Sequence, residues 1–360
     1  MFKDIYRDKV VLVTGNTGFK GSWLSVWLRE LGAHVVGFSL DPPSDPNNFT
    51  ASHLADRVAH VHGDIRDFSK LAETFNDYQP EFVFHLAAKT IVNTSYKEPK
   101  LTFDTNLGGT VNVLEAVRTT PSVKVLVSIT SDKCYENKEW VWGYRENDPM
   151  GGHDPYSASK GCAELAFGAY LRSYGGIGAA SVRAGNVFGG GDWGTDRLLP
   201  NCVRALSDHR PIGIRNPAST RPWQHALEPL SGYLWLGAML AEDPVRYCGS
   251  WNLGPEADNN ITVVEFVERL IKYWGHGCWE NTGVANAPHE ATLLNLNCDK
   301  ARTELKWRPT IGFDEALMMA VDWYKEYYEG RSIDMYHACA GQIKQYSIRA
   351  ASKGLPWAEE

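Results

Sequence analysis

The chain has 360 residues, of which 43% are hydrophobic and 22% charged, as in ordinary globular proteins. This length predicts one large domain and a smaller second lobe. The net charge of −7, with no basic cluster, argues against a nucleic-acid partner, and no apolar run approaches the ~20 residues that span a bilayer. The seven cysteines include no C-x-x-C pair, so we expect a reducing cytoplasm and neither a disulfide framework nor a metal site. A predicted strand follows within ten residues of Met1, so we expect no signal peptide.

The first predicted unit is a strand, a glycine-rich loop and a helix. Residues 10–13 form a continuous β-branched apolar run, which is typical of a buried parallel strand. Gly15, Gly18 and Gly21 follow with the spacing G-x-x-G-x-x-G, and residues 22–31 show a helical pattern that is apolar on most sides. Bare backbone at a helix N-terminus binds anions, so this unit predicts a dinucleotide pyrophosphate site.

Strands and helices then alternate as far as about Arg183, which predicts an α/β fold with a Rossmann-type, doubly wound parallel sheet. We therefore expect a nucleotide-binding domain over residues 1–184 that also carries the catalytic residues. The further strand cores are residues 35–38, 58–61, 82–86, 123–129 and 179–182.

The end of the second strand indicates which dinucleotide binds. Ser39 occupies the position where a carboxylate usually holds the adenosine ribose, and Asp41 follows two residues later. Between Phe38 and Ser52 there is no Arg or Lys to receive a 2′-phosphate, so NAD is favoured over NADP. Asp64 follows the third strand, where it either faces the adenine end or only forms a turn.

The small residues Ala87 and Ala88 follow the fourth strand core, residues 82–86, and permit close approach of a cofactor. On the next helix, Asn106 is expected either to touch a ligand or to brace the catalytic loop. The candidate cofactor contacts are Gly15, Thr17, Gly18, Phe19, Lys20, Gly21, Ser39, Asp64, Ile65, Leu86, Ala87, Ala88, Lys89, Asn106, Tyr156 and Lys160.

Two short strings carry the chemistry. Ser131 follows the apolar run 123–129, and Tyr156 and Lys160 open a helix at positions i and i+4, which lie on one face. An ammonium beside a phenol favours the phenolate, so this trio suits removal of a proton from a hydroxyl during hydride transfer. Asp132 and Lys133 add two titratable groups that simple alcohol oxidation does not need.

Together these residues resemble the extended short-chain dehydrogenases/reductases that act on nucleotide sugars, and the resemblance covers about residues 8–325. In that family an acid after the catalytic Ser or Thr marks the hexose 4,6-dehydratases. The usual string is Thr-Asp-Glu, whereas this chain has Ser131-Asp132-Lys133. This departure, together with Gly-Gly-Asp-Trp at 190–193 and Arg-Pro-Trp-Gln-His at 221–225, makes the chain most similar to the dehydratases that act on CDP-glucose.

The resemblance implies a role for each catalytic residue. Tyr156 would take the proton of the C4 hydroxyl, Ser131 would orient that oxygen, and Lys160 would hold the nicotinamide ribose. Asp132 would protonate the C6 hydroxyl so that water leaves. Lys133 replaces the usual C5 base; it would act as that base, as a cation beside the enolate, or only as a solvated surface lysine.

The second lobe is expected over residues 185–330, beginning with the glycine-rich loop 185–194, and residues 331–360 form an extension to which we assign no role. Family resemblance places substrate contacts here, and for Arg215 ordinary surface charge is an equal alternative. The candidate substrate contacts are Asn186, Arg197, Arg215, Arg221, His289 and Glu290. The preference for cytosine over other bases rests on resemblance alone.

The resemblance also implies an enzyme with bound NAD, CDP-glucose as substrate, a place in deoxysugar and lipopolysaccharide O-antigen biosynthesis, and a homodimer or homotetramer. Alternatives on the same fold are a dTDP-glucose or GDP-mannose 4,6-dehydratase and a nucleotide-sugar 4-epimerase. An alternative of another class is an NAD-sensing binding protein without chemistry.

Overall fold

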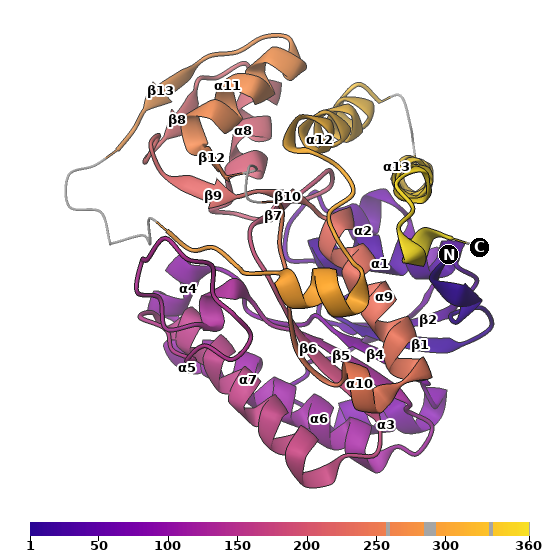
Figure 1. Cartoon of the computed structure of the whole chain (residues 1–360). Helices are drawn as coiled ribbons and strands as arrows, with labels where there is room; N and C mark the ends of the chain where they lie inside the picture. Colours follow the sequence, from indigo (N-terminus) through magenta and orange to yellow (C-terminus); the bar gives the residue numbers. More distant parts are fainter. Residues whose placement is uncertain (257–259, 284–292, 331–333, 360) are drawn as a thin grey trace.

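The computed structural model describes residues 1–256, 260–283, 293–330 and 334–359. Its centre is a seven-stranded parallel sheet in the order β11-β6-β5-β4-β1-β2-β3 (Figure 1). The order reverses direction beside β1, as in doubly wound folds. The strands are β1 (Val10–Thr14), β2 (His34–Ser39), β3 (Ala59–His62), β4 (Phe82–His85), β5 (Val125–Ile129), β6 (Gly178–Ala184) and β11 (Gly249–Leu253).

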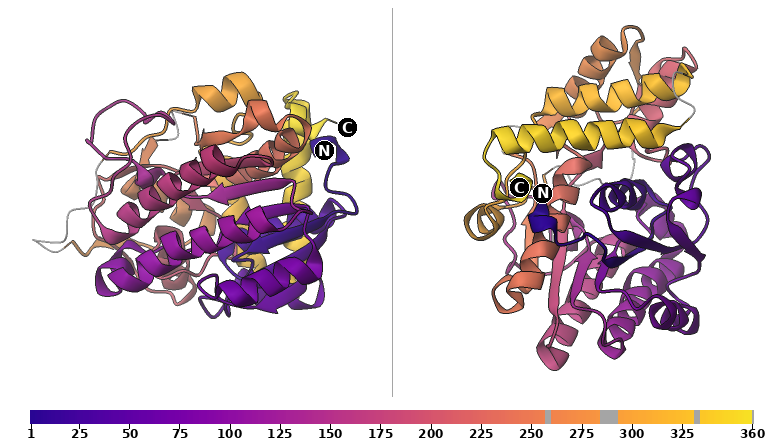
Figure 2. Two further views of the ribbon diagram at one scale, coloured as in Figure 1. Left: turned by 90° about the horizontal axis from the view of Figure 1, so that it is seen from below. Right: turned by 90° about the vertical axis from the view of Figure 1, so that its right-hand side faces the viewer.

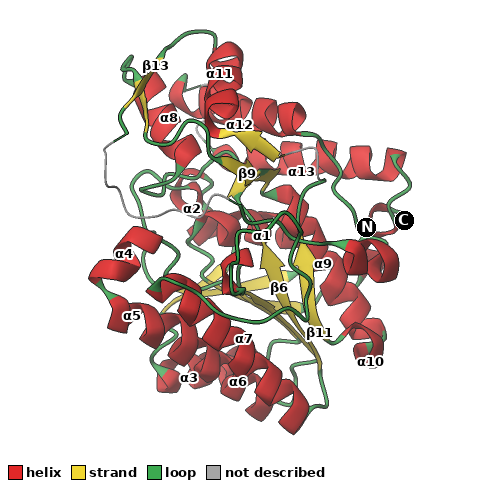
Figure 3. Ribbon diagram, turned by 60° about the vertical axis from the view of Figure 1, so that its left-hand side comes forward, coloured by secondary structure: helices red, strands yellow, loops and turns green. Residues whose placement is uncertain are grey.

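Side chains alternate between the two faces of this sheet. Along β1, Val11 and Val13 join one apolar cluster and Leu12 joins the other, and β4 and β5 repeat the alternation. Both faces therefore need helices. One is covered by α3 (Phe68–Tyr78), α6 (Thr110–Thr119) and α7 (Pro155–Tyr174), and the other by α1 (Phe19–Glu30) and α9 (Leu227–Glu242), with α13 (Met335–Ser352) packed against α1, as Figures 1 and 3 show.

The six predicted strand cores and the predicted fold class are confirmed, but sequence patterns missed β11. This strand and α9 lie within the expected second lobe, yet both pack with the main sheet. α9 buries nearly all of its side chains, because it packs between strands β5 and β6 of the sheet and other helices, among them α1. The chain thus returns to the first domain over residues 227–253, which the expected boundary at 184 did not include.

The second lobe stands over the carboxyl ends of the strands (Figure 1). Three two-stranded pairs form it: β7 (Val187–Phe188) with β10 (Gln224–His225), β9 (Thr220–Pro222) with β12 (Asn260–Thr262), and β8 (Ile212–Ile214) with β13 (Trp279–Asn281). Its helices are α8 (Leu198–Ser207), α11 (Val263–Trp274) and α12 (Phe313–Tyr328). A capping box of Thr262 and Glu265 starts α11.

The remaining elements are short. They are α2 (Asn48–Ala51), α4 (Val92–Lys97), α5 (Pro99–Phe103), α10 (Pro244–Tyr247), the turns η1 (Phe2–Asp4), η2 (Leu54–Asp56), η4 (Asp132–Cys134) and η7 (Pro356–Ala358), and the π-helical turns η3 (Asp104–Gly109) and η6 (Ala301–Leu305).

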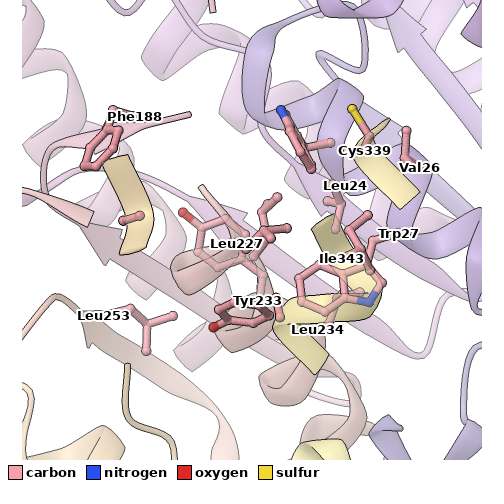
Figure 4. Close-up of a cluster of buried hydrophobic side chains, with 14 of the residues drawn as sticks. Leu24, Val26, Trp27, Phe188, Leu227, Tyr233, Leu234, Leu253, Cys339 and Ile343 are labelled. Atoms are coloured by element: carbon pink, nitrogen blue, oxygen red, sulfur yellow. The ribbon is translucent and has the colours of Figure 1, made fainter. Parts of the chain in front are cut away.

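The C-terminal segment packs behind α1, beside the N-terminus (Figure 2). Cys339 and Ile343 of α13 lie near Leu24 and Trp27 of α1 in the apolar cluster of Figure 4. The buried carboxylate of Glu228 on α9 holds α13 in place. It accepts hydrogen bonds from Tyr346 Oη of α13 (2.7 Å) and from the backbone N–H of Ile311 (2.8 Å). Among the described residues, no helix is both long and apolar enough to cross a membrane.

Glu228 makes stability depend on pH. Burial raises the pKa of its carboxyl from 4.5 to about 7. The folded state therefore binds this proton more tightly than the unfolded chain does, and the resulting stability is lost as pH rises from about 4.5 to about 7. A shift of this size corresponds to roughly 3 kcal/mol.

We expect Glu228→Gln, which keeps the shape and an oxygen acceptor, to be more stable than the wild type at about pH 8 and no more stable at about pH 5. Urea unfolding at both pH values measures the difference. Glu242→Gln at the exposed end of the same helix is the control. An equal difference at both pH values would contradict the assignment.

Candidate active site

A cleft of about 1290 Å³ lies between the carboxyl ends of the strands and the second lobe. This volume exceeds the ~300–1000 Å³ typical of a site for one small ligand, so it suits two ligands together. Its lining includes the glycine loop, all five predicted catalytic residues and the predicted arginines.

The glycine loop forms a cradle of bare backbone. Gly15 has φ +75°, and a Cβ atom there would lie 2.8 Å from the backbone N of Ala87. A Cβ atom on Gly21 would lie 2.1 Å from the carbonyl oxygen of Gly15. No side chain caps the N-terminus of α1, whose first residue follows Gly18. Close-packed backbone and uncapped N–H groups fit the pyrophosphate of a dinucleotide.

The adenosine end of the cleft is fixed by polar contacts between strand ends. Ser39 Oγ donates to Asn16 Oδ1 (2.7 Å), which ties the second strand to the glycine loop. Asp64 lines the cleft and accepts from Arg66 Nε (2.9 Å) and from the Arg66 backbone N–H (2.9 Å), so it also has the expected turn-forming role. The Arg66 side chain lowers the pKa of Asp64. Sequence reasoning missed Arg66, although it lies two residues from Asp64.

Asn106 braces the loop after β4. Its Oδ1 accepts from the Lys89 backbone N–H (2.8 Å), and its Nδ2 donates to the Lys89 carbonyl (3.0 Å) and to Ser159 Oγ (2.9 Å). It is 1% exposed and is absent from the cleft lining, unlike Ile65, Leu86, Ala87, Ala88 and Lys89. Of the two expected alternatives for Asn106, these bonds favour bracing of the loop, because its amide is occupied within the protein.

The structure brings the predicted catalytic residues together. Ser131 follows β5 and begins η4, where its Oγ donates to Asp132 Oδ1 (3.0 Å) and accepts from the Lys133 N–H (3.3 Å). Asp154 caps α7 by accepting from the Ser157 N–H (2.9 Å), with Pro155 in the first turn. This cap sets Tyr156 and Lys160 in the first turns of α7, and both side chains are buried in the cleft wall.

The electrostatics of Tyr156 differ from the sequence expectation. Burial raises its pKa to about 12, while a hydrogen bond with Ser131 and the charge of Arg197 lower it. Lys160 Nζ instead donates to the Ile129 carbonyl (3.5 Å), and burial lowers the pKa of Lys160 to about 8. Arg197 of the second lobe is therefore a cation that lowers the pKa of the phenol, while Lys160 donates toward the end of β5.

Lys20 belongs to the same group of charges. Its Nζ donates to Tyr233 Oη (3.3 Å) on α9. Burial, with the nearby charges of Lys160 and Arg197, lowers the pKa of Lys20 to about 7, and Asp132 opposes this change. Its position in the glycine loop predicted a cofactor contact, but its ammonium extends toward the catalytic residues.

The predicted substrate contacts line the lobe side of the cleft. Arg197 pairs with Asp192 (2.8 Å) and donates to Thr90 Oγ1 (3.1 Å), so it links the lobe to the loop after β4. Arg221 donates to the Thr220 carbonyl (2.8 Å), and Asn186 and Arg215 also border the cleft. His289 and Glu290 lie outside the described residues.

Sequence reasoning missed the buried ion pair of Glu164 and Arg183 (2.7 Å), which lies behind the catalytic loop. The sequence could have indicated Glu164, because this residue lies one turn after Lys160 on the same helix face.

The chain matches the sequence model of the GDP-mannose 4,6 dehydratase family over residues 12–320. It belongs to this family. It is 47% identical to the CDP-glucose 4,6-dehydratase of Salmonella typhimurium over 353 residues, covering 96% of this chain and 98% of the relative. It is 25% identical to the CDP-paratose 2-epimerase of Salmonella typhi, covering 87% and 98%.

Solved structures agree in fold. The dTDP-glucose 4,6-dehydratase of Streptomyces venezuelae, solved with NAD bound, superposes with a TM-score of 0.76 at 26% identity, covering 89% of this chain and 98% of that one. An epimerase of Methanothermobacter thermautotrophicus superposes with a TM-score of 0.78 at 25% identity, covering 91% of this chain and 95% of that one. The predicted membership in the extended short-chain dehydrogenase/reductase family and its 4,6-dehydratases is confirmed.

Asn106→Ala tests the bracing assignment. We expect it to lower the free energy of unfolding of the ligand-free protein by roughly 1–3 kcal/mol, because the Lys89 N–H loses its acceptor. Urea unfolding without ligand measures this, and Asn281→Ala, which removes an exposed acceptor of the Gly283 N–H, is the control. Weaker NAD binding with unchanged ligand-free stability would favour direct contact instead.

Proposed function

We propose that the protein is a CDP-glucose 4,6-dehydratase, an NAD-dependent hydro-lyase that converts CDP-D-glucose to CDP-4-dehydro-6-deoxy-D-glucose and water. The observation that carries this proposal is the 47% identity to a CDP-glucose 4,6-dehydratase over almost the whole of both chains. The joint presence of Ser131, Asp132, Tyr156 and Lys160 in one cleft supports the same chemistry.

The cofactor of this reaction is NAD. The cradle of Gly15, Gly18 and Gly21 suits its pyrophosphate, and the other predicted contacts that border the cleft would hold its two ribose ends. When bound, NAD would accept hydride from C4 of the sugar and later supply it to C6, while a proton returns to C5.

Three residues would manage the proton at C4. Tyr156 removes it from the hydroxyl, and Ser131, whose side chain lowers the pKa of the phenol, orients the oxygen. Because burial, with the charges of Asp132 and Asp154, raises the pKa of Tyr156, the reaction needs cations close to the phenolate. Arg197 is placed for that role, and Lys160 would hold the nicotinamide ribose.

Elimination would then use the turn that follows Ser131. The 4-ketone acidifies the C5 hydrogen, which leaves as a proton, and the C6 hydroxyl leaves as water after receiving a proton from Asp132. Lys133 borders the same cleft and is half-buried, so we propose that it acts at C5, either as the base or as a cation beside the enolate.

We propose that Asn186, Arg197, Arg215 and Arg221 contact the nucleotide sugar, since guanidinium groups bind phosphates in a bidentate manner. The setting would be the cytoplasm, in deoxysugar and lipopolysaccharide O-antigen biosynthesis, with neither nucleic acid nor membrane as partner. We propose that residues 1–184 form the nucleotide-binding domain, which residues 227–253 complete, that the rest of 185–330 forms the substrate lobe, and that 331–360 is an extension.

The deciding experiment incubates the protein with NAD and CDP-, dTDP-, UDP- or GDP-hexoses and follows loss of water by mass spectrometry. We expect CDP-glucose to lose water fastest. Substrate deuterated at C4 should keep its label at C6, because hydride moves within one sugar. An epimerase would return an unchanged mass, and a redox sensor would leave every substrate intact.

Asp132→Asn should separate elimination from oxidation. Loss of the proton donor should slow elimination by ~10²- to 10⁴-fold, whereas proton removal at C4 does not need this acid. Addition of CDP-glucose should therefore make the absorbance of reduced cofactor build up. Tyr156→Phe should show none of that signal, and Asp148→Asn, on the loop before α7, is the matched control. Wild-type dehydration by Asp132→Asn would place the acid elsewhere.

We also propose a homodimer, or a dimer of dimers, through α7 and the neighbouring segment α5–η3. Leu165 and Ala169 are exposed on α7, while Phe103, Leu107, Ala166 and Tyr170 are partly buried along the same surface. Leu165→Glu should shift sedimentation toward the monomer. Val245→Glu, at an apolar and even more exposed position on α10, should not. A wild-type protein that stays monomeric at every concentration would defeat the proposal.

A further inference from the structure

A buried ion pair lies directly behind the catalytic loop. Glu164 and Arg183 are joined at 2.7 Å, and their side chains are 2% and 3% exposed. Glu164 also accepts from the hydroxyl of Ser181 (2.8 Å). A fully desolvated pair is costly unless its hydrogen-bonding capacity is used, so its contacts indicate what it holds.

The pair holds both ends of the segment 130–135, which carries Ser131, Asp132 and Lys133. At the first end, Thr130 Oγ1 donates to Glu164 Oε1. At the far end, Arg183 Nη1 donates to Tyr135 Oη (2.7 Å), and the guanidinium lies over the Tyr135 ring at 4.9 Å. Thr130 and Tyr135 border the cleft, but their hydroxyls are bonded to the ion pair, so their effect on the reaction passes through the residues between them.

The two ends differ in what else holds them. The Thr130 N–H donates to the Val182 carbonyl (2.9 Å), so the sheet itself holds the position next to Ser131. At the far end the backbone pairs with another loop, through the Glu136 N–H and the Pro149 carbonyl (2.9 Å). The Tyr135 hydroxyl connects this end to the sheet, to Arg183 on β6 and to Asn252 Oδ1 on β11 (2.7 Å).

We propose that the Tyr135 hydroxyl, held by the Glu164–Arg183 pair, is a positioning group for the elimination step, because it fixes the turn that carries Asp132 and Lys133. The proposal rests on the 4,6-dehydratase function. Ser131 follows the strand and keeps its place without this hydroxyl, so oxidation at C4 depends on it much less.

Tyr135→Phe isolates the hydroxyl. The ring keeps its stacking on Tyr144 (5.1 Å between centroids), and Arg183 Nη1 keeps its bond to the Glu146 carbonyl (2.8 Å). Because a displacement of about 1 Å can cost ~10²-fold in rate, we expect elimination to slow ~10-fold or more and oxidation to stay within about twofold. Reduced cofactor should therefore accumulate with CDP-glucose.

Two further variants separate positioning from general stability. Thr130→Val removes only the side-chain bond at the end next to Ser131, because the Thr130 N–H keeps its bond to the Val182 carbonyl. Any loss of rate should therefore be equal for oxidation and elimination. Tyr6→Phe removes another buried hydroxyl, which donates to the Leu234 carbonyl (2.6 Å) far from the loop, and should change neither step. The proposal is overturned if Tyr135→Phe slows both steps by one factor, or slows neither.

Hydrogen–deuterium exchange of the ligand-free protein gives a second readout that needs no turnover. Amides 132–135 should exchange faster in Tyr135→Phe and at the wild-type rate in Tyr6→Phe, and equal exchange in both would refute the positioning role. A wild-type protein that fails to dehydrate CDP-glucose would instead refute the proposed function, and the exchange experiment would still decide whether the hydroxyl holds the turn.

Discussion

Burial of the parallel sheet on both faces is the constraint on which the rest of the structure depends. Val11, Leu12 and Val13 face alternate apolar clusters, and each fully buried side chain of this kind contributes roughly 1.5–3 kcal/mol. Helices must therefore cover both faces, and every helix must return the chain to the same end of the next strand. The loops after β1, β4, β5 and β6 consequently meet at one edge, where the cleft lies.

The same burial explains why an ion pair supports the catalytic loop. Segment 130–135 leaves the sheet inside the protein, where its hydroxyl and backbone groups need partners because water is excluded. Glu164 and Arg183 provide several hydrogen bonds from two fixed points, which apolar side chains of the same size would not. Removal of either partner would leave a charge unpaired and cost about 3–5 kcal/mol.

Local patterns predicted the strands and the glycine loop, because continuous apolar runs and glycine spacing are recorded in neighbouring residues. They missed β11, which begins with Gly249 and Ser250 and pairs with a strand that lies about seventy positions earlier in the chain. They left open whether Asn106 braces a loop or contacts a ligand, and they did not give the partner of Lys160, since both depend on which groups are nearest in space. Arg197 acts on Tyr156 from the other lobe, a relation that spacing along the chain does not contain.

Electrostatics then connects ligand binding with the protonation states of the cleft. Burial lowers the pKa values of both Lys20 and Lys160 in the cleft wall, and Asp132 opposes this change at Lys20. For Lys20 the two neighbouring cations add to this effect. The phosphates of a nucleotide sugar carry the opposite charge, so their entry offsets the repulsion and favours the ammonium form. Substrate binding is therefore expected to keep both lysines charged, whereas Arg197 is charged with or without substrate and lowers the pKa of Tyr156 in either state.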